Sequence, residues 1–203
     1  MDGCDIPPLT EPLFPPLNPL DAGEKLCHLH LKSTVSKSQD CSAALLSAGM
    51  GSIHNRFSLE VWIHMYTDGS EIEMDGVAGT GIYCELFAYY RSLGTSKSAF
   101  CSEIEPIKMA LEHLDACLPF PEQRHVVIVS DSQAAILDIA NCLEAPDTMS
   151  IVQCRSIIGK MRNKYKVIIL QWIPSHCGIP GNEKADELAK KGCPVDQAPM
   201  QSG

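Results

Sequence analysis

Residues 172–189 read WIPSHCGIPGNEKADELA, and this stretch carries the strongest structural signal in the chain. Its prolines and glycines predict a loop between a strand end and a helix. Asn182 is a favourable N-cap for a helix over Asn182–Lys191. The loop carries His176, and the helix carries Asp186 near the positive end of its dipole. A carboxylate beside a loop histidine indicates metal-assisted or acid–base hydrolysis, whereas the simpler interpretation is a turn before an amphipathic helix.

The charge of the chain is unevenly distributed. The formal net charge of −9 over 203 residues argues at first against a nucleic-acid partner. No acid occurs from Thr148 to Asn182, however, and the bases in that stretch are Arg155, Lys160, Arg162, Lys164 and Lys166. An acidic protein with one local basic surface can bind a polyanion and still concentrate carboxylates elsewhere for metal. A solvated helix face is the alternative interpretation of these bases.

Composition bears on the compartment. No apolar run approaches the roughly 20 residues that a membrane span needs. The first residues are acidic and do not resemble a secretory signal. The ten cysteines are scattered without zinc-ligand spacing, which favours reduced thiols. We therefore expect an intracellular protein, cytoplasmic or nuclear, with no membrane association, and we expect a monomer.

The chain divides into three parts. Residues 1–58 are rich in proline and small residues and are predicted to be a weakly ordered extension, with a short helix possible near Cys41–Ala48. Residues 59–193 form the predicted domain, and residues 194–203 a flexible tail. Within the domain, strands are predicted at Leu59–Thr67, Val77–Cys84, Leu86–Leu93, 126–129 and 167–172, and helices at Ser98–Cys117, Ser132–Leu143, Ser150–Tyr165 and Asn182–Lys191. This order favours an α/β fold with a five-stranded mixed sheet and helices on both faces.

Acidic residues follow two of the predicted strands. Asp68 follows the first strand and Asp131 follows the buried strand at 126–129. If these strands are neighbours, the two carboxylates lie about one strand spacing apart, roughly 5 Å. Such proximity is costly unless a cation or a proton neutralises it. Glu103 and Asp186 supply two further carboxylates, and oxygen ligands of this number suit Mg²⁺ or Mn²⁺.

Four segments together resemble the ribonuclease H family, type 1 class. They read YTDGS at residues 66–70, SEIEPI at 102–107, SDSQA at 130–134 and the quoted stretch at 172–189, in the order of that family. The resemblance covers about residues 61–192. The sequence of residues 173–182 is similar to that of ribonuclease H domains of non-LTR retrotransposon polyproteins in animals. It implies the ribonuclease H-like three-layer fold and endonucleolytic hydrolysis of the RNA strand of RNA–DNA hybrids by two-metal-ion catalysis.

The resemblance also assigns roles to individual residues. It implies that Asp68, Glu103, Asp131 and Asp186 bind Mg²⁺, with Mn²⁺ as a possible substitute, and that His176 positions or deprotonates water or aids product release. It implies substrate contacts from Gly69, Ser70, Ser132, Gln133 and Asn182. The basic residues Arg155, Lys160, Arg162 and Lys164 are further candidates for hybrid binding. Discrimination of the hybrid would use its shape and the RNA 2′-hydroxyls.

Two departures from the family pattern keep other hypotheses open. Pro106 stands where the family usually has alanine, and a proline inside a helix costs about 3 kcal/mol. It is tolerable if the helix begins at Ser102. Residues 1–58 contain no basic hybrid-binding module, and no reverse-transcriptase core is present, so the chain resembles a fragment or a remnant of a retroelement polyprotein. An inactive nucleic-acid-binding remnant is therefore the second hypothesis, and another nuclease of the same superfold, such as an integrase or resolvase, is the third.

Overall fold

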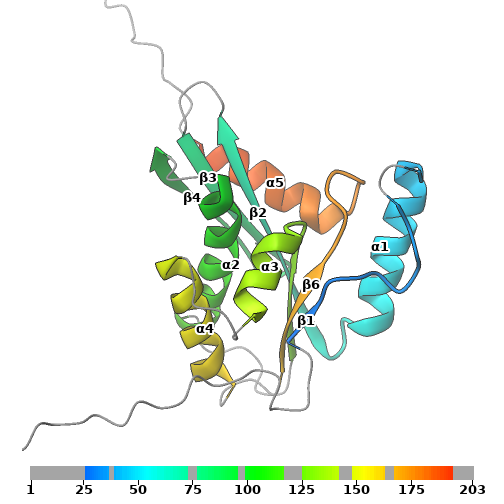
Figure 1. Ribbon diagram of the computed structural model, residues 1–203, viewed down its shortest axis with the longest axis horizontal. Coiled ribbons are helices and arrows are strands. Elements are labelled where there is room, and N and C mark those ends of the chain that lie inside the picture. Colours follow the sequence, from blue (N-terminus) through cyan, green and yellow to red (C-terminus); the bar gives the residue numbers. More distant parts are fainter. Residues whose placement is uncertain are drawn as a thin grey trace, which may run out of the picture.

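A computed structural model describes residues 26–36, 39–72, 77–95, 99–116, 125–141, 148–162 and 167–193. It contains a six-stranded mixed sheet and five helices, packed in three layers (Figure 1). The strands are β1 (Cys27–His28), β2 (Trp62–Ile72), β3 (Val77–Cys84), β4 (Phe87–Thr95), β5 (His125–Ser130) and β6 (Ile168–Trp172). The helices are α1 (Ser42–Arg56), α2 (Ala99–Ala116), α3 (Gln133–Ala140), α4 (Met149–Met161) and α5 (Pro180–Gly192). The predicted mixed α/β architecture is confirmed.

The sheet has the strand order β1-β6-β5-β2-β3-β4. Strands β2, β3 and β4 form an antiparallel meander, whereas β1, β6, β5 and β2 run parallel to one another. The prediction of five strands missed β1, which pairs only two residues with β6. Because parallel strands place their carboxyl ends along one rim, residues that follow β1, β6 and β5 share that rim with the middle of β2.

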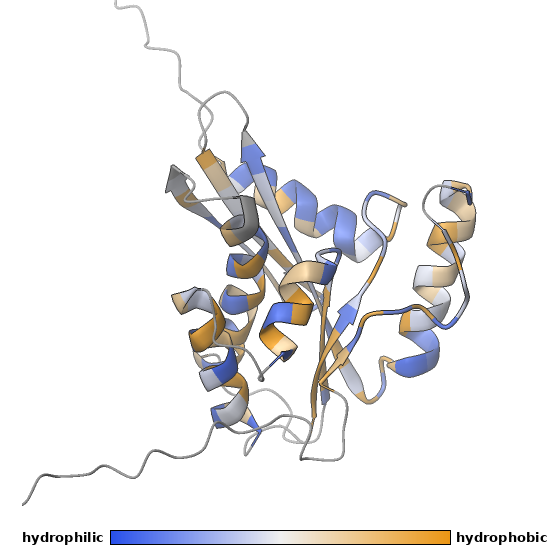
Figure 2. Cartoon of the chain, viewed as in Figure 1, coloured by the Kyte–Doolittle hydropathy of each residue, from blue (hydrophilic) through white to orange (hydrophobic). Residues whose placement is uncertain are grey.

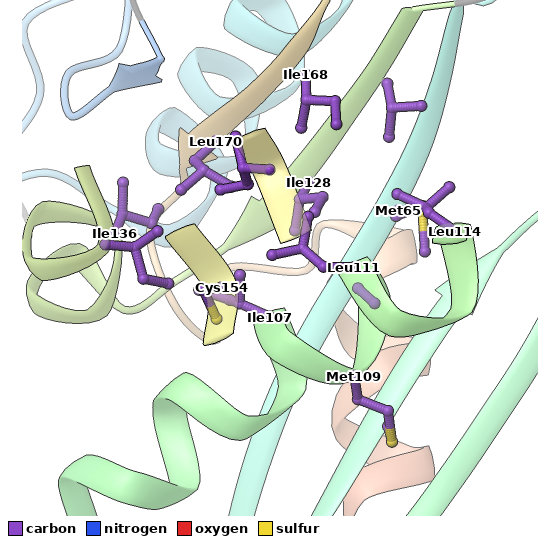
Figure 3. Packing of buried hydrophobic residues seen from close by; sticks show 14 of the residues in the cluster. Met65, Ile107, Met109, Leu111, Leu114, Ile128, Ile136, Cys154, Ile168 and Leu170 are labelled. Carbon is purple, nitrogen blue, oxygen red and sulfur yellow. The ribbon is translucent and has the colours of Figure 1, made fainter. Parts of the chain in front are cut away.

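Two hydrophobic clusters lie on the two faces of the sheet. The larger cluster joins α2, α3 and α4 to one face, and its fully buried members include Met65, Ile107, Leu111, Ile128 and Leu170 (Figure 3). The smaller cluster lies on the other face, where side chains of α1 and α5 pack against alternate residues of the same strands. The sheet is therefore buried on both faces, which explains the continuous apolar runs of its central strands.

The close approach of α5 to the sheet depends on two glycines. A Cβ atom at Gly81 would meet the carbonyl oxygen of Ala185, and one at Gly79 would meet that of Ala189. The contact face of α5 is made of small residues, and the rest of this helix is largely hydrophilic (Figure 2). The backbone of α5 thus rests directly on β3, and this fixes the height of Asp186 above the sheet.

The prediction for the N-terminal part is wrong over residues 42–56. These residues form the 15-residue helix α1, which extends well beyond the short helix considered near Cys41–Ala48. Several buried positions of α1 are small residues, namely Ala48, Gly49 and Ser52, so its contact face lacks a strong apolar period. Residues 1–25 and the predicted tail at 194–203 lie outside the described residues.

Two local predictions at the site also need correction. Asp68 lies inside β2 and not after it, because β2 continues to Ile72 in register with β3. Asn182 is not an N-cap: α5 begins with Pro180 after the cap residue Ile179, and Asn182 is buried in its first turn. Helix α2 begins at Ala99, one residue after the predicted start, so the condition of a start at Ser102 is not met and Pro106 lies within the helix. Ser132 is the N-cap of α3, since its hydroxyl accepts from the Ala135 amide.

Candidate active site

A polar cleft of about 550 Å³ lies at the rim where β2, β5 and the loop after β6 meet α2 and α5. Predicted site residues that line it are Asp68, Gly69, Ser70, Glu103, Asp131, Ser132, His176 and Asp186. They come from five separate elements and loops of the chain. The fold therefore brings the residues of all four sequence motifs to one place.

Asp68 is one of two buried acids of the cleft, with the same 9% exposure as Asp186. It lies in β2 beside Ser130 and Asp131, because the parallel pairing of β2 with β5 ends at the pair Thr67–Ser130. Its Oδ1 accepts the amide of Gly69 at 2.8 Å, whereas its buried Oδ2 has no hydrogen-bond partner among the described residues. Burial, and then the charges of Asp131 and Asp186, raise the pKa of Asp68 to about 8. The Gly69 amide and then the Lys190 ammonium lower this pKa, but burial and the neighbouring acids outweigh them.

Asp131 and Glu103 are positioned from the end of β5. The indole of Trp172 donates to the Asp131 carbonyl at 3.1 Å, which ties this residue to the end of β6. The Ser132 hydroxyl donates to Glu103 Oε2 and also accepts from the Ala135 amide. A single serine thus caps α3 and orients the carboxylate that projects from α2.

Gly69 permits α2 to approach the site. A Cβ atom at this position would meet the Ser102 carbonyl oxygen and would lie 3.6 Å from the Pro106 ring. Pro106 has no amide to donate to the Ser102 carbonyl four residues earlier, so the backbone ladder of α2 is interrupted next to Glu103. The close contact between β2 and α2 nevertheless keeps Glu103 on the cleft.

Asp186 is held by an ion pair within α5. Lys190 Nζ lies 2.5 Å from Asp186 Oδ2, and its side chain is 62% exposed whereas that of Asp186 is 12% exposed. The hydrogen bond to Asp186 raises the pKa of Lys190. Lys190 and Ser175 both line the cleft, but neither was predicted from the sequence. The spacing of four residues between Asp186 and Lys190 was the available signal for Lys190.

The loop after β6 presents His176 in a restricted backbone conformation. His176 is exposed and has a φ of 50°, in the left-handed region that few residues other than glycine adopt. The Cys177 thiol donates to the Pro174 carbonyl, and the Gly178 amide donates to Glu183 of α5. The first contact closes the loop around the imidazole, and the second ties the loop to α5.

Several predicted substrate residues lie outside the cleft lining. Gln133 is exposed at the start of α3, and its Nε2 donates to the Leu29 carbonyl at 2.8 Å. Asn182 is 2% exposed, and its buried Oδ1 has no partner in the described part of the chain. It precedes Asp186 by one helical turn, so both residues lie on the buried side of α5.

The basic residues of α4 are partly committed to structural contacts. The Arg155 guanidinium donates to the carbonyls of Asp138, Ile139 and Asn141 at the end of α3. Lys160 pairs with Asp115 of α2 at 2.6 Å, although its side chain is 63% exposed. Arg162 lies just beyond α4, and Lys164 lies outside the described residues.

The cleft contains no preassembled metal cage. Among the described ranges, no three side chains of His, Cys, Asp or Glu are arranged closely enough to hold an ion. Asp186 is paired with Lys190, and Glu103 is bound by Ser132. The donor set still fits a divalent cation, because oxygen ligands dominate the cleft and Asp68 Oδ2 is buried without a partner. The described helices include none long and apolar enough to cross a membrane.

Comparisons with known proteins agree with this architecture. A family model described as RNase H matches residues 61–194. The chain is 25% identical over 149 residues to a protein named ribonuclease H from Pseudomonas entomophila (strain L48), and the match covers 68% of this chain and 97% of that protein. The family match spans the strands, α5 and the loop that build the cleft, and it supports a ribonuclease. The chain belongs to the RNase H family.

Proposed function

We propose that this protein is a metal-dependent endoribonuclease that hydrolyses the RNA strand of RNA–DNA hybrids. The observation that carries the proposal is the buried Asp68, beside Asp131 and Asp186, with one oxygen unsatisfied in a cleft that also holds Glu103 and His176. A strongly perturbed carboxylate in a cleft is typical of a functional site. Membership of the RNase H family supports the substrate class.

Asp68, Glu103, Asp131 and Asp186 would hold the cofactor, which we propose to be Mg²⁺ with Mn²⁺ as a substitute. Two divalent ions, when bound, activate water and stabilise the leaving oxygen of a phosphodiester. Binding requires Asp68 to be ionised and requires the Lys190 ammonium to leave or share Asp186. The long side chain of Lys190 is largely exposed, so it can swing into solvent or toward a phosphate.

Residues of the chain itself would position the substrate and transfer protons. His176 lies on the exposed lip of the cleft, where its imidazole can accept a proton from water or donate one to a departing group. The same cleft is lined by Gly69, Ser70 and Ser132, which would contact a nucleic-acid strand bound there. Gln133 can use only its amide oxygen and remaining hydrogen, because Nε2 already donates to Leu29.

The basic residues of α4 provide a second surface for the hybrid. Lys160 is the best candidate there, since its ammonium is mostly exposed despite its ion pair with Asp115. Exposed ion pairs contribute little free energy, so a phosphate can replace the carboxylate at small cost. Arg155 contributes less, because its guanidinium caps α3. Arg162 and Lys164 extend the same basic stretch in sequence.

An inactive nucleic-acid-binding remnant is the second candidate function. Pro106 lies inside α2, three residues after Glu103, where it interrupts the helical ladder. The similarity of residues 173–182 to retrotransposon ribonuclease H domains motivates a retrotransposon origin. The scattered cysteines, which have no zinc-ligand spacing, motivate an intracellular location. A monomeric state completes the proposal. A remnant would bind hybrid without turnover.

Cleavage of a 5′-labelled RNA–DNA hybrid by the purified full chain tests the proposal. We expect cutting in Mg²⁺ and Mn²⁺, none in EDTA, and none of single-stranded RNA or double-stranded DNA. Asp131→Asn should reduce cutting at least 10³-fold, on the order of the largest effects of a lost charge-stabilising group. Asp138→Asn, an acid on α3 away from the cleft, is the matched control and should cut normally.

A different pattern would separate the two candidates. A folded protein that binds hybrid but fails to cut it with either metal is the remnant. Pro106→Ala would then test whether the interrupted helix is responsible, because it restores the amide opposite the Ser102 carbonyl. Full activity of Asp131→Asn would contradict the assignment of the cleft acids.

A further inference from the structure

Residues 29–34 lie on the same rim of the sheet as the cleft, although they precede the family match at residues 61–194. Strand β1 adds a fourth parallel strand beside β6, so its carboxyl end points the same way as those of β6 and β5. We call residues 29–34 the rim segment. β5 leads to Asp131, β6 leads to the His176 loop, and β1 leads to the rim segment. The rim thus continues past the elements that define the family.

The backbone of the rim segment is fixed by hydrogen bonds to two helices, α3 and α1. The Leu29 carbonyl accepts from Gln133 of α3, and the His30 carbonyl accepts from Arg56 of α1, each at 2.8 Å. The Lys32 amide donates to the buried Ser52 hydroxyl at 2.8 Å. Arg56 also donates to Gln171 of β6 at 2.8 Å, which links α1 to the sheet. The rim segment is therefore held in one place and does not need to be ordered by a ligand.

The side chains of the rim segment contrast with this anchored backbone. His30, Lys32, Ser33 and Thr34 are exposed. Neither the His30 imidazole nor the Lys32 ammonium makes a hydrogen bond or ion pair with any residue that the structure describes. No acid occurs from Leu26 to Gln39, in a chain whose net charge is −9. Fixed donors with no internal partner, next to an acidic cleft, are suited to a polyanion.

We propose that the rim segment is an accessory contact for the sugar–phosphate backbone of the bound nucleic acid, with Lys32 as its principal phosphate ligand. This inference rests on the proposed function. β1 lies two strand spacings from β5, or about 10 Å. Successive phosphates of one strand are about 3.4 Å apart along a duplex axis, so a contact beyond the end of β1 falls at least about three base pairs from the end of β5. Gln133 links the two parts, since it starts α3 beside the cleft and binds Leu29.

Salt-dependent hybrid binding tests this contact. The parent is the full chain with Asp131→Asn in Mg²⁺, so that the hybrid stays intact, and fluorescence anisotropy gives its Kd at several salt concentrations. Adding Lys32→Ala should weaken binding several-fold and reduce the slope of log Kd against log salt by about 0.9, the value for one lost phosphate contact. Lys191→Ala removes the same charge from an exposed position near the end of α5 and should leave the slope unchanged.

Hybrid length provides the second readout. The hybrid is shortened by about three to four base pairs, first from one end and then from the other. Shortening from one end only should abolish the difference in Kd between the parent and Lys32→Ala. A slope and affinity that Lys32→Ala leaves unchanged would overturn the accessory contact while the proposed function stands. A parent that binds no hybrid at all would overturn both the accessory contact and the proposed function. An equal change in slope for Lys191→Ala would also overturn the accessory contact, because it would show only a general attraction between charges.

Discussion

Asp68 combines burial with two neighbouring acids, and this has a consequence for stability. Its pKa is raised from the ordinary value of 3.8 to about 8, first by burial and then by Asp131 and Asp186. Between these two values the folded state binds the proton that the unfolded state has released. The free energy of unfolding of the metal-free protein therefore falls as pH rises through this window.

We predict that this loss disappears when the carboxyl is removed. In EDTA, the free energy of unfolding of the parent should drop between pH 5 and pH 8 by roughly 2–4 kcal/mol more than that of Asp68→Asn, since one proton corresponds to about 1.4 kcal/mol per pH unit. Urea denaturation at the two pH values measures the difference. Mg²⁺ at pH 8 should restore the parent and have less effect on the variant. An equal change in the free energy of unfolding of the parent and of Asp68→Asn between the two pH values would contradict the raised pKa of Asp68.

At the residue scale, the sequence predicted the acids of the cleft better than their partners. Asp68 and Asp131 were expected to lie close together if their strands were neighbours, and the parallel pairing of β2 with β5 confirms that the strands are. The contacts of Lys190 and Ser132 with cleft acids depend on side-chain orientation, which a one-dimensional pattern does not specify. Gln133 was assigned to the substrate, but its contact with Leu29 requires a strand that the sequence analysis did not predict.

Among the elements, α5 has the most direct effect on the cleft. Its backbone rests on β3 at Gly79 and Gly81, and it carries Asp186. Any side chain on β3 at these positions would have to displace the helix backbone, which cannot yield as a flexible side chain can. Catalytic geometry is sensitive to shifts of about 1 Å.

We predict that Gly81→Ala lifts α5 and disables the site while the remaining fold persists. The added Cβ meets the Ala185 carbonyl oxygen and the Leu188 side chain, so stability should fall by about 1–3 kcal/mol and hybrid cleavage by at least tenfold. Gly51→Ala on α1 is the matched control, because its nearest neighbour lies 4.0 Å away. This control should gain up to about 1 kcal/mol from helix propensity. Thermal unfolding followed by circular dichroism measures the stability of each variant, and the cleavage assay measures its activity. Normal cleavage by Gly81→Ala would contradict the direct packing of α5 on β3.

The types and order of the domain elements were predictable, but several boundaries were not. Apolar runs and helical spacing marked the core strands and α2, whose interior is fully buried. The end of β2 was missed because Gly69 and Ser70 usually signal a turn, whereas here they pair with β3. Helix α1 was largely missed because small residues occupy several of its buried positions.

At the scale of the whole molecule, α1 belongs to the core although it precedes the family match. Leu45, Ile53 and Phe57 are buried in the cluster on the α5 face of the sheet. Burial of each such side chain is worth about 1.5–3 kcal/mol. The part of the chain outside residues 61–194 therefore contributes to the stability of the part inside it.

We predict that a chain beginning at Leu59 is much less stable than one beginning at Leu26. The shorter chain loses α1, β1 and the contacts of Arg56, and its melting temperature should fall by at least 10 °C, on a scale of about 2–4 °C per kcal/mol for a domain of this size. The longer chain keeps every contact described for these elements and serves as the control. Equal melting temperatures would show that α1 and β1 contribute little to stability.

Strand β1 is only two residues long, yet it occupies the open side of β6. Without it, the apolar strand Ile168–Trp172 would become a free sheet edge, and such edges recruit further chains into intermolecular sheets. A short, non-extendable edge strand prevents this recruitment, because it offers too few backbone groups to template another chain. The two residues of β1 would thus keep a concentrated solution of this protein from aggregating.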